Sequence, residues 1–222
     1  VAEKSISVTN LVYGTTRLQP VVLQIGEAAG ALAALAVKRG LPVAQIQVRD
    51  VQRAILDGGG YLLPYLDLPA GHPHFKAIQR IGATGIIKGV GMNKGWENQT
   101  WFHTDSLITN SELSAGLIEF YSEAAGAELK NGEEGFVTLE SISSYISSII
   151  KNYNPDKATT LQEVKLLIER VAKESDLKNI LNDLKNFKGK RVLTRLECAV
   201  LIDKILNPFD EFGINFRGEI LN

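Results

Sequence analysis

The chain has 222 residues, of which 45% are hydrophobic and 22% charged, so it is long enough for one large domain or two small ones with a real core. Its 24 basic and 25 acidic residues give a formal net charge of -1, which argues against a broad cationic surface for nucleic acid or anionic lipid. A single cysteine, Cys198, excludes an intrachain disulfide framework, and its apolar helical surroundings favour a buried hydrophobic residue over a nucleophile.

The chain begins at Val1, without a methionine or a signal-peptide pattern, and we interpret this as the start of a fragment or of a processed form. The sequence contains no run of about 18 consecutive apolar residues. We therefore expect no transmembrane segment.

Residues 19–39 are expected to form one helix. Pro20 suits the first turn, where its missing N–H is not needed as a donor. Lys38 and Arg39 suit the last turn because the helix dipole is negative there. Gly40 is typical of the residue that caps the C-terminus of a helix.

Two glycines lie inside this predicted helix. Gly26 and Gly30 are four residues apart and therefore share one face. Each costs about 1 kcal/mol of helix stability relative to alanine, so we expect a neighbour that approaches the helix backbone closely. That neighbour is either a packed helix or sheet, or a cofactor at the helix N-terminus, where free N–H groups and the helix dipole favour anionic oxygens.

Residues 7–43 resemble the C-terminal segment of a family of FAD-dependent oxidoreductases with a two-dinucleotide-type FAD fold. In that family a short strand and a Gly-Ser/Thr-x-Arg-x-x-Pro turn lead into a Gly-x-Ala-Ala-Gly helix, whose N-terminus points at the pyrimidine side of the flavin. The segment at 48–62 resembles the small terminal helix of the same family. The resemblance implies a strand–turn–helix piece within residues 1–60 and a set of cofactor-binding residues, in which the two glycines permit close packing: Gly14, Thr15, Arg17, Pro20, Val21, Gly26 and Gly30.

The sequence lacks the unit that would hold the rest of FAD. The pyrophosphate and adenosine of a dinucleotide need a strand, a Gly-x-Gly-x-x-Gly turn and a helix, with an acidic residue for the ribose. The glycines of GVGMNKG at 89–95 follow a predicted helix rather than a strand. We therefore expect this chain to carry one wall of a flavin site, and FAD to bind only in a full-length parent whose remaining part is the partner of this segment.

Residues 61–72 are expected to form a linker or an elaborated loop, because glycine and proline residues gather at its ends. Its tyrosine and leucine residues predict that it packs against another part of the protein.

Residues 73–222 are expected to be a second, helical region. Capping boxes mark three helix starts in it: Thr109 with Glu112, Thr160 with Glu163, and Thr194 with Glu197.

The second region contains an internal repeat, since the segment at 107–112 matches the segment at 192–197. Together with GIIKG at 85–89, this pattern resembles the S-layer homology module, which implies two repeats here, at 73–126 and 136–206, and no third. In that family three repeats form a prism that binds anionic cell-wall polysaccharide, partly through an arginine at the start of a helix.

The carbohydrate-binding arginine of the S-layer homology module is kept only once in this chain. Asn110 stands in its place in the first repeat, and Arg195 keeps it in the second. The resemblance therefore gives two candidate ligand-binding residues, Arg195 and Trp101, but a structural use of the repeats is favoured over binding of a carbohydrate.

No arrangement of nucleophile, base or paired carboxylates with catalytic spacing is found in the sequence. His72 and His74 lack a third ligand, so no metal site is predicted.

We expect a mainly α-helical chain that is the C-terminal fragment of an FAD-dependent oxidoreductase and is not active alone. The alternatives are a non-catalytic cell-envelope or polysaccharide-binding module, or part of a polysaccharide lyase, because proteins of this kind have also been labelled xanthan lyases. Both resemblances are to bacterial proteins, and the second allows a periplasmic or cell-envelope location.

Overall fold

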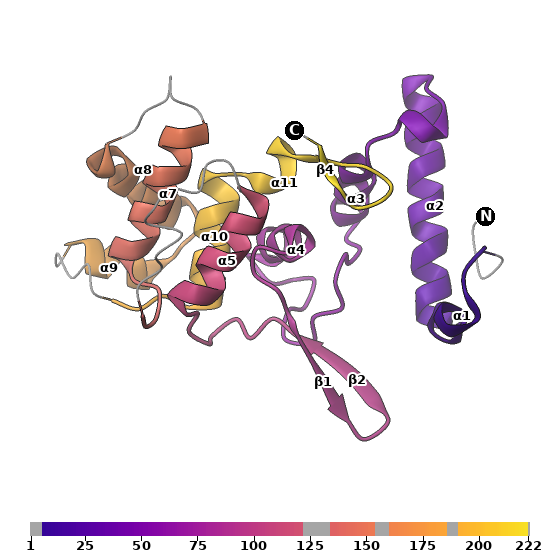
Figure 1. The fold of residues 1–222 in the computed structure, drawn as a ribbon, viewed down its shortest axis with the longest axis horizontal. Helices are drawn as coiled ribbons and strands as arrows, with labels where there is room; N and C mark the ends of the chain where they lie inside the picture. Colours follow the sequence, from indigo (N-terminus) through magenta and orange to yellow (C-terminus); the bar gives the residue numbers. More distant parts are fainter. Residues whose placement is uncertain (1–5, 122–133, 154–159, 186–190, 222) are drawn as a thin grey trace. The chain divides into compact units, whose positions relative to one another are not determined.

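The computed structural model describes residues 6–121, 134–153, 160–185 and 191–221 (Figure 1). It is mainly helical, as the sequence predicts. The elements are α1 (Asn10–Thr16), α2 (Gln19–Arg39), a short 3-10 helix (Val43–Gln45), α3 (Val48–Asp57), α4 (Phe75–Thr84), β1 (Val90–Lys94), β2 (Glu97–Trp101), α5 (Asn110–Phe120), α7 (Leu139–Tyr153), α8 (Leu161–Glu174), α9 (Lys178–Lys185), α10 (Arg195–Ile205), α11 (Pro208–Glu211), β3 (Gly213–Ile214) and β4 (Ile220–Leu221).

The chain divides into two compact units, one made of residues 1–62 with 212–222 and the other of residues 63–211. We call them the N-terminal unit and the helical unit. This differs from the predicted division in two ways. Most of the predicted linker belongs to the helical unit, where Tyr65 and Leu68 are buried. The last residues return to the N-terminal unit, where β3 packs against α3. The predicted end of the first repeat, at residue 126, lies outside the described residues.

In the N-terminal unit, α2 has the bounds that the sequence predicts. It begins at Gln19 with Pro20 in its first turn and ends at Arg39. Gly40 caps the C-terminus in the left-handed conformation, with φ of 63°, where a side chain would be strained. The prediction of this helix is confirmed.

The predicted strand before α2 is wrong, because α1 occupies that position. The hydroxyl oxygen of Thr9 accepts a hydrogen bond from the backbone N–H of Val12 at 3.4 Å, which caps α1 at its start. A strand needs a partner strand, and the strands of the described residues pair only as β1 with β2 and β3 with β4. The observed piece is therefore helix–turn–helix rather than strand–turn–helix.

The helical unit is closed by three short segments, each of which leads directly into a helix. The segments at 107–109, 136–138 and 192–194 precede α5, α7 and α10, and each pairs with the other two through antiparallel bridges. The first N–H of each helix donates to the carbonyl that precedes the next segment, and these bonds are Asn110 to Gly135 at 2.9 Å, Leu139 to Arg191 at 3.3 Å and Arg195 to Ser106 at 2.8 Å. The three segments thus form a closed ring, which we call the segment ring.

Each segment of the ring has the same internal design. The middle residue is fully buried in all three, and the last is a threonine whose hydroxyl oxygen caps the following helix; the middle residues are Ile108, Val137 and Leu193, and the threonines are Thr109, Thr138 and Thr194. The sequence predicts two repeats, whereas the structure contains three such segments. The segment at 136–138 departs from the capping-box pattern because Ser141, rather than a glutamate, bonds the cap residue.

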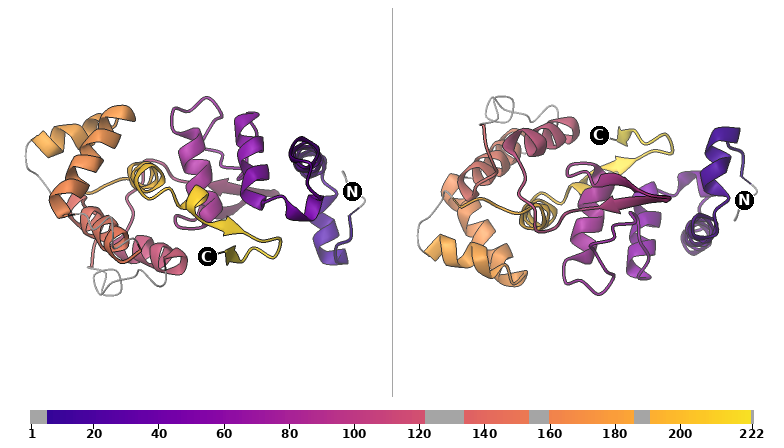
Figure 2. Two further views of the ribbon diagram at one scale, coloured as in Figure 1. Left: turned by 90° about the horizontal axis from the view of Figure 1, so that it is seen from above. Right: turned by 90° about the horizontal axis from the view of Figure 1, so that it is seen from below.

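A hairpin of β1 and β2 extends from the helical unit (Figure 1), and the views from above and below show it at the opposite end of that unit from α8 and α9 (Figure 2). Asp67 fixes the chain that follows β2. Its carboxylate accepts hydrogen bonds from the backbone N–H groups of Phe102 at 2.8 Å, His103 at 2.6 Å and Thr104 at 3.2 Å. The predicted linker therefore holds the base of the hairpin in place.

Gly116 makes a close contact that no other residue type would allow. It lies in α5, where an added methyl group would overlap the backbone carbonyl of Ile86. A backbone atom cannot swing away as the end of a flexible side chain can. The segment after α4 therefore approaches α5 at this glycine.

We expect Gly116→Ala to lower the free energy of unfolding by at least about 2 kcal/mol, because α5 must move away from the chain at Ile86. Urea denaturation followed by circular dichroism measures the change. Gly91→Ala is the matched control, since no described atom lies within 4 Å of the added methyl there. Equal stability of the two variants would show that this close contact does not exist.

Candidate functional site

The residues expected near a flavin lie together at the junction of α1 and α2. Gly14 and Thr15 are in the last turn of α1, and the Thr15 hydroxyl donates to the carbonyl of Val12 at 2.8 Å. Arg17 is the C-cap residue of α1 and is exposed. Pro20 and Val21, in the first turn of α2, follow within a few residues. The junction therefore brings five of the seven predicted residues together, with Gly14 and Thr15 in helical rather than turn conformation.

The start of α2 is electropositive. Its N-cap residue, Leu18, has no side chain that can accept a hydrogen bond from the first turn. Pro20 has no N–H, so the N–H groups of Gln19 and Val21 remain available at the positive end of the helix dipole. The guanidinium of Arg17 adds a full positive charge next to them in the sequence. An anionic or electron-rich group is the kind of ligand that this end favours.

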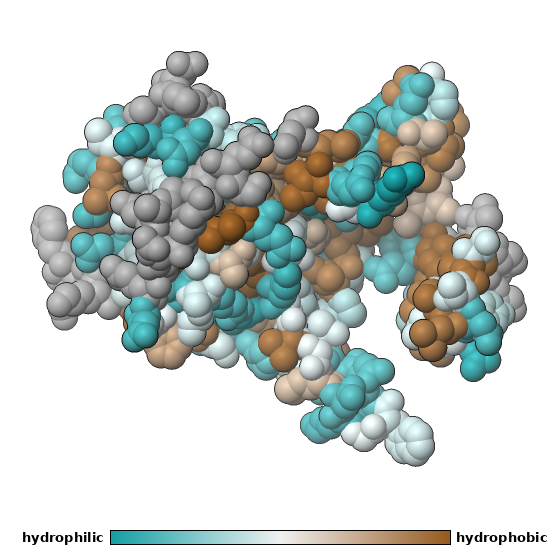
Figure 3. Space-filling model, viewed as in Figure 1, coloured by the Kyte–Doolittle hydropathy of each residue, from teal (hydrophilic) through white to brown (hydrophobic). Residues whose placement is uncertain are grey.

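Gly30 of α2 lies on an exposed face of the helix, whereas Gly26 is half-buried. No described atom lies within 4 Å of a methyl group built on Gly30. Leu23 and Val37, each seven residues from Gly30 and so on its side of the helix, are 74% and 84% exposed. We call this surface the uncovered face of α2, and its exposed residues are Leu23, Glu27, Gly30, Ala33, Ala34 and Val37. Figure 3 shows hydrophobic residues in brown at the surface of α1 and α2.

Parts of α2 contact the rest of the N-terminal unit. The side-chain amide of Gln24 donates to the carbonyl of Tyr61 at 2.5 Å. The carboxylate of Glu27 lies over Gly60, so close that an added methyl group there would come within 2.6 Å of it. Ala36 is buried, and α2 packs against α3. Among the described residues, the close neighbour that the glycines predict is therefore not found at Gly30.

By length and composition, α2 is the one helix of the described segments that could cross a membrane, with a mean hydropathy of 1.7 over its most apolar window. A search for consecutive apolar residues misses it because Gln24 and Glu27 interrupt the run. The core helix of a soluble protein and a signal sequence pass the same test.

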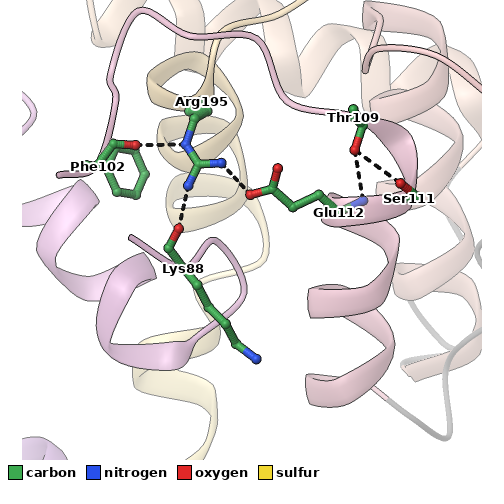
Figure 4. Close-up of polar contacts among 6 residues, drawn as sticks. All are labelled: Lys88, Phe102, Thr109, Ser111, Glu112 and Arg195. Carbon is green, nitrogen blue, oxygen red and sulfur yellow. Dashed lines mark hydrogen bonds and ion pairs between the residues drawn. The ribbon is translucent and has the colours of Figure 1, made fainter. Parts of the chain in front are cut away.

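Arg195 is bonded entirely within the helical unit (Figure 4). Its Nε donates to the carbonyl of Phe102 at 2.8 Å, one terminal nitrogen donates to the carbonyl of Lys88 at 2.5 Å, and the other pairs with Glu112. The guanidinium carbon lies 5.3 Å from the centre of the Phe102 ring, within the range of a cation–π contact. Arg195 is buried, and it joins α10 to the chain on both sides of the hairpin.

The other positions equivalent to Arg195 are also occupied from within. Asn110, at the start of α5, donates to the carbonyl of Phe136 at 3.3 Å and accepts from the hydroxyl of Tyr145 at 3.2 Å. Leu139, at the start of α7, is a buried apolar residue. All three helix starts at the segment ring are thus filled by side chains of the same unit.

The aromatic residues near the hairpin separate into different environments. Trp101 stacks on His103, with ring centres 6.1 Å apart, and its indole N–H donates to the side chain of Gln99 at 3.2 Å. Phe102 is fully buried. Trp96, at the hairpin turn, is fully exposed.

Among the described residues no three His, Cys, Asp or Glu side chains are placed to hold a metal ion. Cys198 is buried, which confirms its predicted environment, and burial raises the pKa of its thiol far above the ordinary value. The thiol is therefore protonated at neutral pH and is a poor nucleophile.

Residues 1–55 match the family model described as FAD dependent oxidoreductase. This match supports the relation of the N-terminal segment to FAD-dependent oxidoreductases, and it includes all seven residues expected near the flavin. No curated protein and no solved structure matches the chain. The helical unit lies outside the matched region.

We expect Arg195→Ala to lower the free energy of unfolding by about 3 kcal/mol, because it leaves two carbonyls and the Glu112 carboxylate without their partner. Arg195→Lys should lose somewhat less, since a lysine keeps the charge but not the planar fork. Arg217→Ala, at an exposed arginine, is the control. Urea denaturation measures all three, and a loss at position 195 no larger than the control would contradict a structural role.

Proposed function

We propose that residues 1–55 are the C-terminal segment of an FAD-dependent oxidoreductase fold and contribute one wall of its flavin site. The observation that carries this proposal is the match of residues 1–55 to the FAD dependent oxidoreductase family. The α1–α2 junction is the part of the matched segment that would face the ring. Hydride or electron transfer would be the chemistry of the flavin when bound, and the protein would supply orientation and electrostatics.

The residues at the junction fit the pyrimidine end of a flavin. That end carries carbonyl oxygens and becomes more negative when the flavin is reduced. The free N–H groups of Gln19 and Val21 and the charge of Arg17 would stabilise that negative charge. Gly14 leaves room for a planar ring, since no described atom lies within 4 Å of a methyl group placed there.

The residues do not fit the other half of FAD. The sequence has no strand, Gly-x-Gly-x-x-Gly turn and helix to hold the pyrophosphate. The ring-facing wall and the dinucleotide-binding half of such a site would therefore belong to different parts of a larger protein. On this proposal the 222-residue chain is not an active enzyme by itself.

For the helical unit we propose a structural role. Arg195, the arginine that the S-layer homology resemblance assigns to an anionic glycan, has all of its guanidinium nitrogens engaged with the chain. The equivalent positions hold Asn110, which is hydrogen-bonded, and Leu139, which is apolar. An anionic glycan would have to break these contacts before it could use them, and this favours the structural role over a polysaccharide-binding module.

The first test is a titration of the purified 222-residue chain with FAD, followed by quenching of flavin fluorescence. We expect a colourless preparation and no binding at micromolar FAD, because one wall of the site provides too few contacts. Free FAD in buffer gives the baseline. A yellow preparation, or saturable quenching in the micromolar range, would contradict the proposal that the flavin site is divided between this chain and another part of a larger protein.

A second test uses the longest reading frame of the gene that contains this sequence, expressed as one protein. We expect it to bind FAD, and we expect Arg17→Ala to lower the reduction potential of the bound flavin, because a positive charge that stabilises the reduced form is lost. Lys38→Ala, an exposed cation at the other end of α2, is the matched control. Equal potentials in the two variants would show that Arg17 does not face the flavin.

A further inference from the structure

We propose that His72 and His74 form an acid-sensitive cap at the start of α4, which is closed at neutral pH and opens when the imidazoles are protonated. The device lies in the helical unit and is independent of the flavin chemistry proposed for residues 1–55. Three observations carry it: a hydrogen bond between the two residues, the short distance between their rings, and their place at the positive end of a helix.

The imidazole of His72 caps α4 in the way that a serine or an aspartate caps other helices. The N-cap residue of α4 is His74, and its own side chain makes no cap hydrogen bond. Nδ1 of His72 accepts a hydrogen bond from the backbone N–H of His74 at 3.1 Å. The N–H of Phe75 donates to the carbonyl of His72 at 2.9 Å. Two successive N–H groups at the start of the helix are therefore bonded to one residue.

The bond to Nδ1 exists only while His72 is neutral. A ring nitrogen that accepts a hydrogen bond carries no proton, so the proton of the neutral ring lies on Nε2. Protonation places a hydrogen on Nδ1 and turns the acceptor into a donor that faces another donor, the N–H of His74. The bond is then lost. A positive charge is also added at the end of the helix where the dipole is itself positive.

The second imidazole adds to the effect because the two rings are close together. Their centres are 5.6 Å apart, so two imidazolium charges would repel each other. Lys204 of α10 adds a further positive charge that acts on His74, whereas Asp176, before α9, acts in the opposite direction. The other charged side chains of α4 and of α11, which packs against it, are Lys76, Arg80, Asp210 and Glu211.

These surroundings set the direction in which stability changes with pH. Burial, followed by the charge of His72, lowers the pKa of His74 below the ordinary histidine value. With a lowered pKa, the unfolded chain binds the proton more readily than the folded protein does. The folded state is therefore most stable above the ordinary histidine pKa of about 6.5, and it loses stability as the pH falls through and below that value.

The cap lies on a helix that joins several parts of the helical unit. The side-chain amide of Gln79 in α4 makes two hydrogen bonds to the backbone of Leu63, at 2.8 and 2.9 Å. Arg80 pairs with Asp203 of α10. Phe75, the first residue of α4, is buried. Opening of the cap therefore weakens the helix that attaches the predicted linker segment and α10 to each other.

The first experiment is a pH titration of the histidine ring nitrogens in the isotope-labelled 222-residue chain, followed by long-range proton–nitrogen NMR. The chain has three histidines, and single substitutions assign their signals. At neutral pH we expect His72 in the tautomer with an unprotonated Nδ1. We expect the pKa of His74 to lie below the ordinary histidine value. A hydrogen on Nδ1 of neutral His72 would overturn the proposal.

The second experiment measures the midpoint of thermal unfolding at about pH 7.5 and at about pH 5.5, which bracket histidine titration. Tryptophan fluorescence follows the helical unit, because Trp96 and Trp101 both lie in it. His72→Asn keeps a side-chain acceptor that does not titrate. A double variant combines it with His74→Gln. His103→Asn is the matched control, because it removes the third histidine at a φ of 60°, which asparagine tolerates.

Between the two pH values we expect the wild type and His103→Asn to lose at least about 4 °C, and the double variant less than about 1 °C. His72→Asn should lose an intermediate amount, because His74 still titrates. Asp203, whose pKa is raised by burial, remains in every variant and so does not distinguish them. Equal losses in the wild type and the double variant would overturn the proposal. A loss below about 1 °C in the wild type would overturn it without any variant.

Discussion

An apolar helix that leaves one face in water is poorly stabilised until another surface covers it, and α2 is such a helix. Its own chain covers the side near Gln24 and Ala36, while Leu23, Gly30 and Val37 face solvent. The start of the same helix, next to Arg17, has no side chain that caps its first N–H groups. Residues 1–55 match the FAD dependent oxidoreductase family, and under the proposed function another part of a flavoprotein completes the N-terminal unit.

The helical unit has the opposite character, because buried polar side chains such as Arg195 and Asn110 are hydrogen-bonded within the unit. The segment ring joins three helix starts through backbone hydrogen bonds, and buried residues fill its centre. Arg195 connects α10 to the chain near the hairpin, and Asp67 fixes the chain after β2. A second ion pair, between half-buried Arg80 and buried Asp203, ties α4 to α10 with two bonds at 2.7 and 2.5 Å. These contacts support the structural role that we propose for this unit.

Features that depend on neighbouring residues in the sequence could be predicted, and features that depend on distant ones could not. The bounds of α2 follow from Pro20 and Gly40, and the full capping boxes at Thr160 and Thr194 are confirmed. At Thr109 the cap forms, but Glu112 pairs with Arg195. The predicted strand failed because its partner strand is not among the described residues. The segment at 136–138 was missed because a serine replaces the glutamate of the cap, although the pattern of two apolar residues and a threonine was visible. The partner of Arg195 at Phe102 is 93 residues away, beyond any local pattern.

Amide hydrogen exchange, followed by mass spectrometry on the 222-residue chain, tests most directly whether the N-terminal unit is incomplete. An uncovered helix opens locally at little cost in free energy, whereas a helix inside a closed core exchanges only through larger unfolding. We therefore expect peptides from α2 to exchange much faster than peptides from α10, which is almost wholly buried. Protection of α2 equal to that of α10 in the isolated chain would show that the helix needs no further neighbour, and would contradict the account given above.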